Sequence, residues 1–129
     1  MCFRRIFKKR YNQIVSNFAD NEISLVSASP NFYGQYSLGR GQLRGNGVLI
    51  LTIDNLFFEM YFPKKKFNFP LKNIRSVDTV KSFLGKTQFR NLLQISFIND
   101  KGVEDSAAWL VKNLDVWINR IEQIIKMKK

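Results

Sequence analysis

The feature that most constrains this chain is the stretch 43–74, LRGNGVLILTIDNLFFEMYFPKKKFNFPLKNI, in which short apolar runs alternate with turn-forming residues. Glycine-asparagine, aspartate-asparagine and proline-lysine interruptions are typical of tight turns between antiparallel strands. The pattern predicts strands at 47–53, 56–62 and 67–71, the first two forming a hairpin. Because side chains alternate across a strand and both faces of 47–53 are apolar, we expect this hairpin to be covered on both sides, with an N-terminal helix as one cover.

The rest of the chain continues the strand pattern. Residues 20–31 are polar and are interpreted as a linker with one short strand near 23–26. Further strands are expected in the first half of 32–43 and at 74–81, 92–98 and 103–111, with a loop at 82–91 and a hairpin turn at 100–102. The Gly-x-Gly at 39–41 is not taken as a phosphate loop, because no Gly-Lys-Ser/Thr ending follows it.

A helix is expected at each end of the chain. In 113–129, Asn113 can cap a helix with a strongly apolar face that closes over the sheet. In 3–18, apolar residues fall on one stripe at helical spacing, and the remaining surface is basic. Two interpretations of that N-terminal helix stay open: its stripe packs on the sheet, or the helix lies in a lipid headgroup layer or a partner's groove. The second interpretation gives a membrane-contacting set: Arg4, Arg5, Phe7, Lys8, Lys9 and Arg10.

Composition narrows the classes of function. The chain has 129 residues, enough for one domain with its own core, and a formal net charge of +11. That charge favours polyanionic partners such as anionic lipid, nucleic acid or an acidic protein face. Cys2 is the single cysteine and histidine is absent, so we expect a reducing, cytoplasmic location, no metal or other cofactor, and none of the usual imidazole catalysis. No run reaches the length of a spanning helix.

Several motifs together resemble the pleckstrin-homology-like superfold, specifically GRAM-type and bacterial pleckstrin-homology-like domains. These are GVLILT (47–52), LFF (56–58), PLKNIRSV (70–77), LLQISF (92–97) and AAWLVKNLDVW (107–117). The resemblance covers about residues 32–127 and implies a mostly β fold, a barrel of about seven antiparallel strands capped by the C-terminal helix. It also implies lipid, phosphoinositide or protein binding without catalysis. The expected organisation is therefore a helix at 1–19, a linker at 20–31 and a domain at 32–129.

The expected binding face lies at one end of the sheet. Strand turns alternate between the two ends, so the turns near 44–47 and 63–66 share an end, and the resemblance adds the turn at 100–102. The predicted lipid-binding residues are Arg40, Arg44, Lys64, Lys65, Lys66 and Lys101. The alternative is that these lysines belong to a merely solvated turn. Family members that bind phosphoinositides carry a basic residue in the second strand; 47–53 has none, so inositol-phosphate specificity is not implied.

The sequence thus predicts a non-catalytic module on an anionic membrane surface, peripheral to the inner face. A protein-interaction or scaffold domain without a lipid ligand is the alternative. Nucleic acid ranks third as a partner, because the aromatic residues follow core periodicity and no nucleic-acid-binding motif is present. Catalysis is not expected, since the carboxylates near the strands, including Glu59 and Asp105, form no recognisable acid and base pair.

Overall fold

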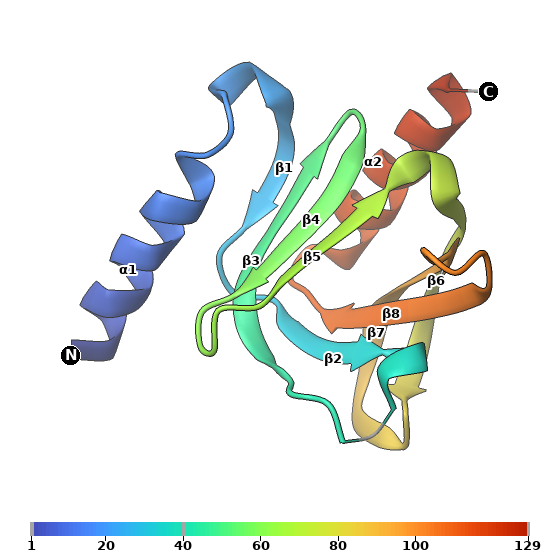
Figure 1. Ribbon diagram of the computed structural model, residues 1–129, viewed down its shortest axis with the longest axis horizontal. Helices are drawn as coiled ribbons and strands as arrows, with labels where there is room; N and C mark the ends of the chain where they lie inside the picture. Colours follow the sequence, from blue (N-terminus) through green and yellow to red (C-terminus); the bar gives the residue numbers. More distant parts are fainter. Residues whose placement is uncertain (1, 40, 129) are drawn as a thin grey trace.

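The computed structural model describes residues 2–39 and 41–128, together with their side chains except those of 2–6 and 86–89. Within these residues it contains two α-helices, three short 3-10 helices and eight strands (Figure 1). In chain order these are α1 (Cys2–Val15), η1 (Asp20–Glu22), β1 (Ile23–Ser27), β2 (Asn31–Gln35), η2 (Tyr36–Leu38), β3 (Gly45–Thr52), β4 (Asn55–Met60), β5 (Lys66–Pro70), η3 (Leu71–Asn73), β6 (Ile74–Phe83), β7 (Lys86–Ile98), β8 (Glu104–Leu110) and α2 (Leu114–Met127).

The strands form one antiparallel sheet in the order β5-β4-β3-β2-β8-β7-β6, and β1 pairs with β3 outside this path. The predicted mostly β class is confirmed, with 47% of residues in strands and a helix at each end of the chain. The expected closed barrel is wrong: the sheet stays open, with β5 and β6 at its two ends. The short strand expected near 23–26 within the linker 20–31 is confirmed as β1, which pairs with β3.

Strand β3 joins the two halves of the sheet. Its first residues pair with β2 and the rest of it pairs with β1 on one side and β4 on the other. Glycine is required where β3 passes closest to β4, because a Cβ added at Gly47 would collide with the Glu59 carbonyl and come within 2.8 Å of the Phe58 ring. The absence of a side chain at this position allows the close approach of the two backbones.

The main core lies between the inner face of the sheet and α2. Aromatic rings dominate it: Phe32, Phe58 and Phe67 pack within 6.3 Å of one another, and Trp109 packs against Phe32 at 5.5 Å. The helix covers these rings with Trp117, Ile121 and Ile124, as its i, i+3, i+4 spacing predicts.

Helix α1 covers the opposite face of the same hairpin. Ile14 is buried against Val48, Ile50 and Tyr61, with Phe57 at the margin. From Tyr11 to Phe18 the predicted apolar stripe therefore packs on the chain's own sheet, and the prediction that the 47–62 hairpin is covered on both faces is confirmed. In Figure 1 the two helices lie on either side of the sheet, α1 at the left and α2 at the right.

Two local predictions were wrong. Residues 82–91 do not form a loop: β6 continues to Phe83, β7 begins at Lys86, and only Leu84 and Gly85 separate them. Both turn residues have positive φ, 51° and 78°, as two-residue hairpin turns require. Asn113 does precede α2, but it adopts the left-handed conformation and its side chain makes no capping hydrogen bond.

Candidate functional site

An aromatic residue and three lysines project from the turn between β4 and β5. Strand β4 ends at Met60, and Phe62 beyond it is 85% exposed. Lys64 and Lys66 are exposed, and the ammonium of Lys65 lies 5.3 Å from the centre of the Phe67 ring. We call Phe62, Lys64, Lys65 and Lys66 the lysine turn. It presents one large apolar side chain with cations directly beside it.

The first half of α1 lies next to the lysine turn. The Phe7 ring stacks on Tyr61 with centroids 4.8 Å apart, and Figure 1 shows the start of α1 and the β4–β5 turn on the same side of the molecule. Lys8 and Lys9 are exposed on the helix. Burial, opposed in part by the Arg10 charge, raises the pKa of Tyr61 to about 12, so its hydroxyl stays protonated and donates to the Ala28 carbonyl at 2.6 Å.

Arg10 does not belong with the outward-facing cations of α1. Its guanidinium forms an ion pair with Glu59 at 2.9 Å, with the Arg10 side chain only 14% exposed. The same Nη2 donates to the Met60 carbonyl at 3.3 Å. The other expected helix residues, Arg4 and Arg5, have side chains outside the described part of the structure. Among the described residues, neither helix is long and apolar enough to cross a membrane.

Of the remaining predicted lipid-binding residues, Arg44 and Lys101 lie in the described part of the structure, and neither is part of the lysine turn. Arg44 is half-buried, and its Nε donates to the Tyr33 carbonyl at 2.7 Å, which ties it to β2. Lys101 is exposed in the β7–β8 turn, which Figure 1 places at the right while the β4–β5 turn is at the left. Lys66 lines a cavity with Asp100 of that turn, so it faces the space between the two turns. Arg40 lies outside the described residues.

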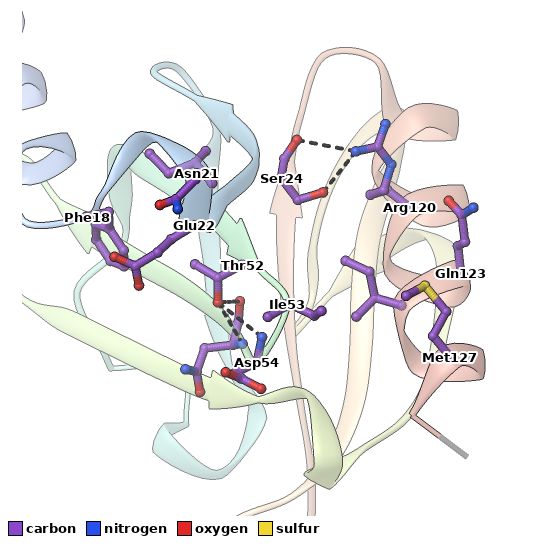
Figure 2. A pocket seen from close by; sticks show the side chains of 13 residues that line it. Phe18, Asn21, Glu22, Ser24, Thr52, Ile53, Asp54, Arg120, Gln123 and Met127 are labelled. Atoms are coloured by element: carbon purple, nitrogen blue, oxygen red, sulfur yellow. Dashed lines mark hydrogen bonds between the residues drawn. The ribbon is translucent and has the colours of Figure 1, made fainter.

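A second concave surface lies at the other end of the β3–β4 hairpin. It is a cleft of about 810 Å³ between η1, the start of β1, the turn at 52–55 and the second half of α2 (Figure 2). Its apolar lining comes from Phe18, Ile23, Ile53, Ile124 and Met127. Sequence analysis did not find this cleft, because its walls come from three segments that are far apart in the chain.

Hydrogen bonds fix the polar parts of the cleft. The Arg120 Nη1 donates to the Ser24 hydroxyl at 2.9 Å and links α2 to β1 across the opening, as Figure 2 shows. The Thr52 hydroxyl accepts from the backbone N–H groups of Asp54 at 3.2 Å and Asn55 at 3.0 Å, which holds the turn in shape. Lys128 forms an ion pair with Asp54 at 2.8 Å.

The two buried carboxylates are both engaged in structural contacts. Glu59 pairs with Arg10, and Asp105 accepts hydrogen bonds from the side chains or backbones of Gln35, Ser37 and Ser106. Among the described residues no three cysteine, aspartate or glutamate side chains gather as a metal site would require.

Comparison with known proteins gives similarity of fold alone. No family model matches the chain, and no curated protein matches it. A chain of a solved structure entitled "The 8S snRNP Assembly Intermediate" superposes with a TM-score of 0.60 at 6% identity, over 84% of this chain and 83% of that one. The C-terminal domain of an unknown protein from Leishmania infantum has a TM-score of 0.53 at 14% identity, over 95% of this chain and 98% of that one.

Proposed function

We propose that this protein is a non-catalytic binding module that associates with anionic membrane surfaces through the lysine turn. The observation that carries this proposal is the exposure of Phe62, at 85%, beside Lys64 and Lys66. A large aromatic side chain at a turn has no packing role there. It suits the headgroup layer of a bilayer, where aromatic rings settle and lysines reach the lipid phosphates.

The position of α1 strengthens the proposal. Its first half adjoins the lysine turn through the stacking of Phe7 on Tyr61, and it adds Lys8 and Lys9 to the same side of the molecule. Because the apolar stripe of α1 packs on the sheet from Tyr11 to Phe18, that half of the helix offers no apolar face to lipid. The described residues that α1 adds to the surface are Lys8, Lys9 and the exposed part of Phe7. Several cations near one surface add their attractions to anionic lipid.

The proposed class of module is pleckstrin-homology-like. An antiparallel sheet followed by a C-terminal helix that packs on its inner face supports this interpretation. The engagement of Glu59 and Asp105 in structural contacts supports a binding role without catalysis.

The test is co-sedimentation with phosphatidylcholine vesicles and with phosphatidylcholine–phosphatidylserine vesicles over a salt series. We expect binding to the anionic vesicles only, weakening as salt rises. Reversing three charges with K64E, K65E and K66E should weaken binding by at least about 100-fold, since each lysine near the surface contributes about 1 kcal/mol. Phe62→Ser should weaken binding with no loss of thermal stability, because the side chain is exposed.

A matched control separates the lysine turn from the overall charge. The triple variant K72E, K112E and K126E changes the net charge equally at exposed positions on other elements. It should retain most of the vesicle binding. If both triple variants lose vesicle binding equally, or if the protein binds neutral and anionic vesicles equally, the proposal that the lysine turn is the binding surface is overturned.

A protein-docking role is the second candidate. The cleft beside α2 favours it, and the chain's fold is similar to that of a chain in the structure entitled "The 8S snRNP Assembly Intermediate". If the protein binds no vesicles even at low salt, the membrane role is excluded and the protein-docking role is favoured.

A further inference from the structure

The cleft lies at the opposite end of the β3–β4 hairpin from the lysine turn. Gly47 pairs with Met60 next to the lysine turn, whereas Leu51 pairs with Leu56 beside the 52–55 turn that forms part of the cleft. A molecule held on a surface by its lysine turn would therefore present the cleft away from that surface. The cleft is independent of the membrane contact proposed above.

Exposed apolar side chains converge in the cleft. Ile53 is 55% exposed at the tip of the β3–β4 turn, and Met127 is 68% exposed at the end of α2. Between them lie Ile23 and Ile124, which are more deeply buried. Figure 2 shows Ile53 placed between β1 and α2 with Met127 on the helix side. A volume of about 810 Å³ is in the range of ligand sites and holds several side chains of a partner.

The charges around these apolar residues favour a cationic ligand, although the chain as a whole is strongly basic. Glu22 and Asp54 contribute two carboxylates, and each has only one of its oxygens in a hydrogen bond or ion pair among the described residues, with Ala19 and Lys128 respectively. The lining also contains one cation, Arg120, whose hydrogen-bond partner Ser24 is neutral, so the lining holds two carboxylates against one guanidinium. Lys128 balances Asp54, which leaves Glu22 as the carboxylate without an ion pair among the described residues. The C-terminal end of α2 adds partial negative charge from its last carbonyls.

We propose that this cleft binds a segment of a partner protein that presents an apolar side chain next to a lysine or arginine. The apolar side chain fits between Ile53 and Met127, and the cation lies beside Glu22 and Asp54. A net charge of +11 repels basic peptides at long range. Binding of such a peptide would therefore have to come from the local chemistry of the cleft.

The test is fluorescence anisotropy with three labelled synthetic peptides, measured without vesicles. One peptide has a central leucine flanked by arginines, a second has the leucine flanked by aspartates, and a third has serine in place of leucine between arginines. The first should bind most tightly. Ile53→Ser should weaken its binding about tenfold through the lost apolar contact. Glu22→Gln should weaken it about threefold and keep the acceptor for the Ala19 N–H.

Matched substitutions elsewhere serve as controls. Val103→Ser removes an apolar side chain of similar exposure, 58%, from the β7–β8 turn, and Glu104→Gln removes an exposed carboxylate. Neither should change the affinity. The proposal is overturned if no peptide binds, if the aspartate peptide binds as tightly as the arginine peptide, or if Ile53→Ser leaves the affinity unchanged while the variant remains folded. None of these outcomes depends on membrane binding.

Discussion

Glu59 is buried on the face of β4 that α1 covers, and its negative charge is balanced by one guanidinium. Arg10 contacts it through Nη2, and the buried Nε of Arg10 has no hydrogen-bond partner among the described residues. The desolvation of both charges is thus only partly compensated. Loss of one partner from such a pair lowers the free energy of unfolding much more than replacement of both partners by apolar residues of similar size does.

This imbalance predicts that mutations of Arg10 and Glu59 have strongly non-additive effects on the free energy of unfolding. Glu59→Leu alone should lower the free energy of unfolding by about 3–5 kcal/mol, because the Arg10 charge is left buried and unpaired. The double variant R10M and E59L should return to within about 1 kcal/mol of the original protein, since no buried charge remains. Urea denaturation of the two single variants and the double variant measures the coupling. A double variant as unstable as E59L would show that the pair does not act as a unit.

Asp105 is held by hydrogen bonds, and no cation pairs with it among the described residues. Its carboxylate accepts from Gln35 Nε2 at 2.7 Å, from the Ser37 N–H at 2.9 Å, from Asn99 Nδ2 at 3.3 Å and from its neighbour's N–H at 2.9 Å. Burial by itself raises the pKa of Asp105, but the hydrogen bonds from Ser37, Gln35 and Ser106 outweigh it and hold the pKa below its ordinary value. One side chain thereby ties η2 and the β7–β8 turn to β8.

A depressed pKa makes this contribution dependent on pH. The ionised carboxylate stabilises the folded state above the ordinary carboxyl pKa, and the stabilisation is lost as pH falls through the lowered pKa of the folded protein. Asp105→Asn should lower the free energy of unfolding by about 1–3 kcal/mol at neutral pH, because the asparagine amide places an N–H donor opposite other donors. The difference in unfolding free energy between the two proteins should shrink in acid. A difference that is constant with pH would contradict this role for the charge.

At the scale of elements, the β6–β7 hairpin is the clearest test of local backbone geometry. Gly85 has a φ of 78°, in the region that L-residues avoid, so Gly85→Ala should lower the free energy of unfolding by about 1 kcal/mol. In a flexible loop, as the sequence predicts here, alanine would cost nothing. Gly41→Ala is the control, because Gly41 has open space around it and no positive φ; it should be neutral or slightly stabilising.

The same hairpin shows which structural features the sequence patterns do not predict. Short apolar runs separated by turn-forming residues predict the β3–β4 hairpin, and helical spacing predicts both helices. The 82–91 segment was misinterpreted because Leu84 is not a usual residue for a positive-φ turn and its polar neighbours resemble a loop. The lysine turn was predicted, but the strand pattern placed Phe62 in β4, which in fact ends two residues earlier.

The cleft is a property of the tertiary structure, and no local signal identifies it. Ile53 belongs to the apolar run of the predicted strand 47–53 and is expected to be covered there, whereas the sequence assigns no role to Met127. Their exposure results from the way α2 and β1 diverge above the 52–55 turn. Only the folded chain brings them together with Glu22 and Arg120.

For the whole molecule, the main point is the separation of two surfaces of different chemistry. The lysine turn and the start of α1 combine cations with exposed aromatic residues, while the cleft combines apolar side chains with two carboxylates and one guanidinium. The rigid β3–β4 hairpin holds these surfaces at its two ends, and its buried residues belong to cores on both faces. Sites that share no residues and lie at opposite ends of a rigid element should bind independently.

This arrangement predicts that the protein bridges a vesicle and a peptide. The labelled leucine–arginine peptide should not co-sediment with neutral vesicles, whether or not the protein is present. More of the peptide should co-sediment with weakly anionic vesicles when the protein is present than when it is absent. Its affinity for vesicle-bound protein should stay within about twofold of that for free protein, since little coupling is expected. Ile53→Ser should abolish the extra recruitment while the protein itself still sediments. Displacement of the peptide by vesicles would show that the two surfaces compete, which would place the membrane contact at the cleft end of the hairpin.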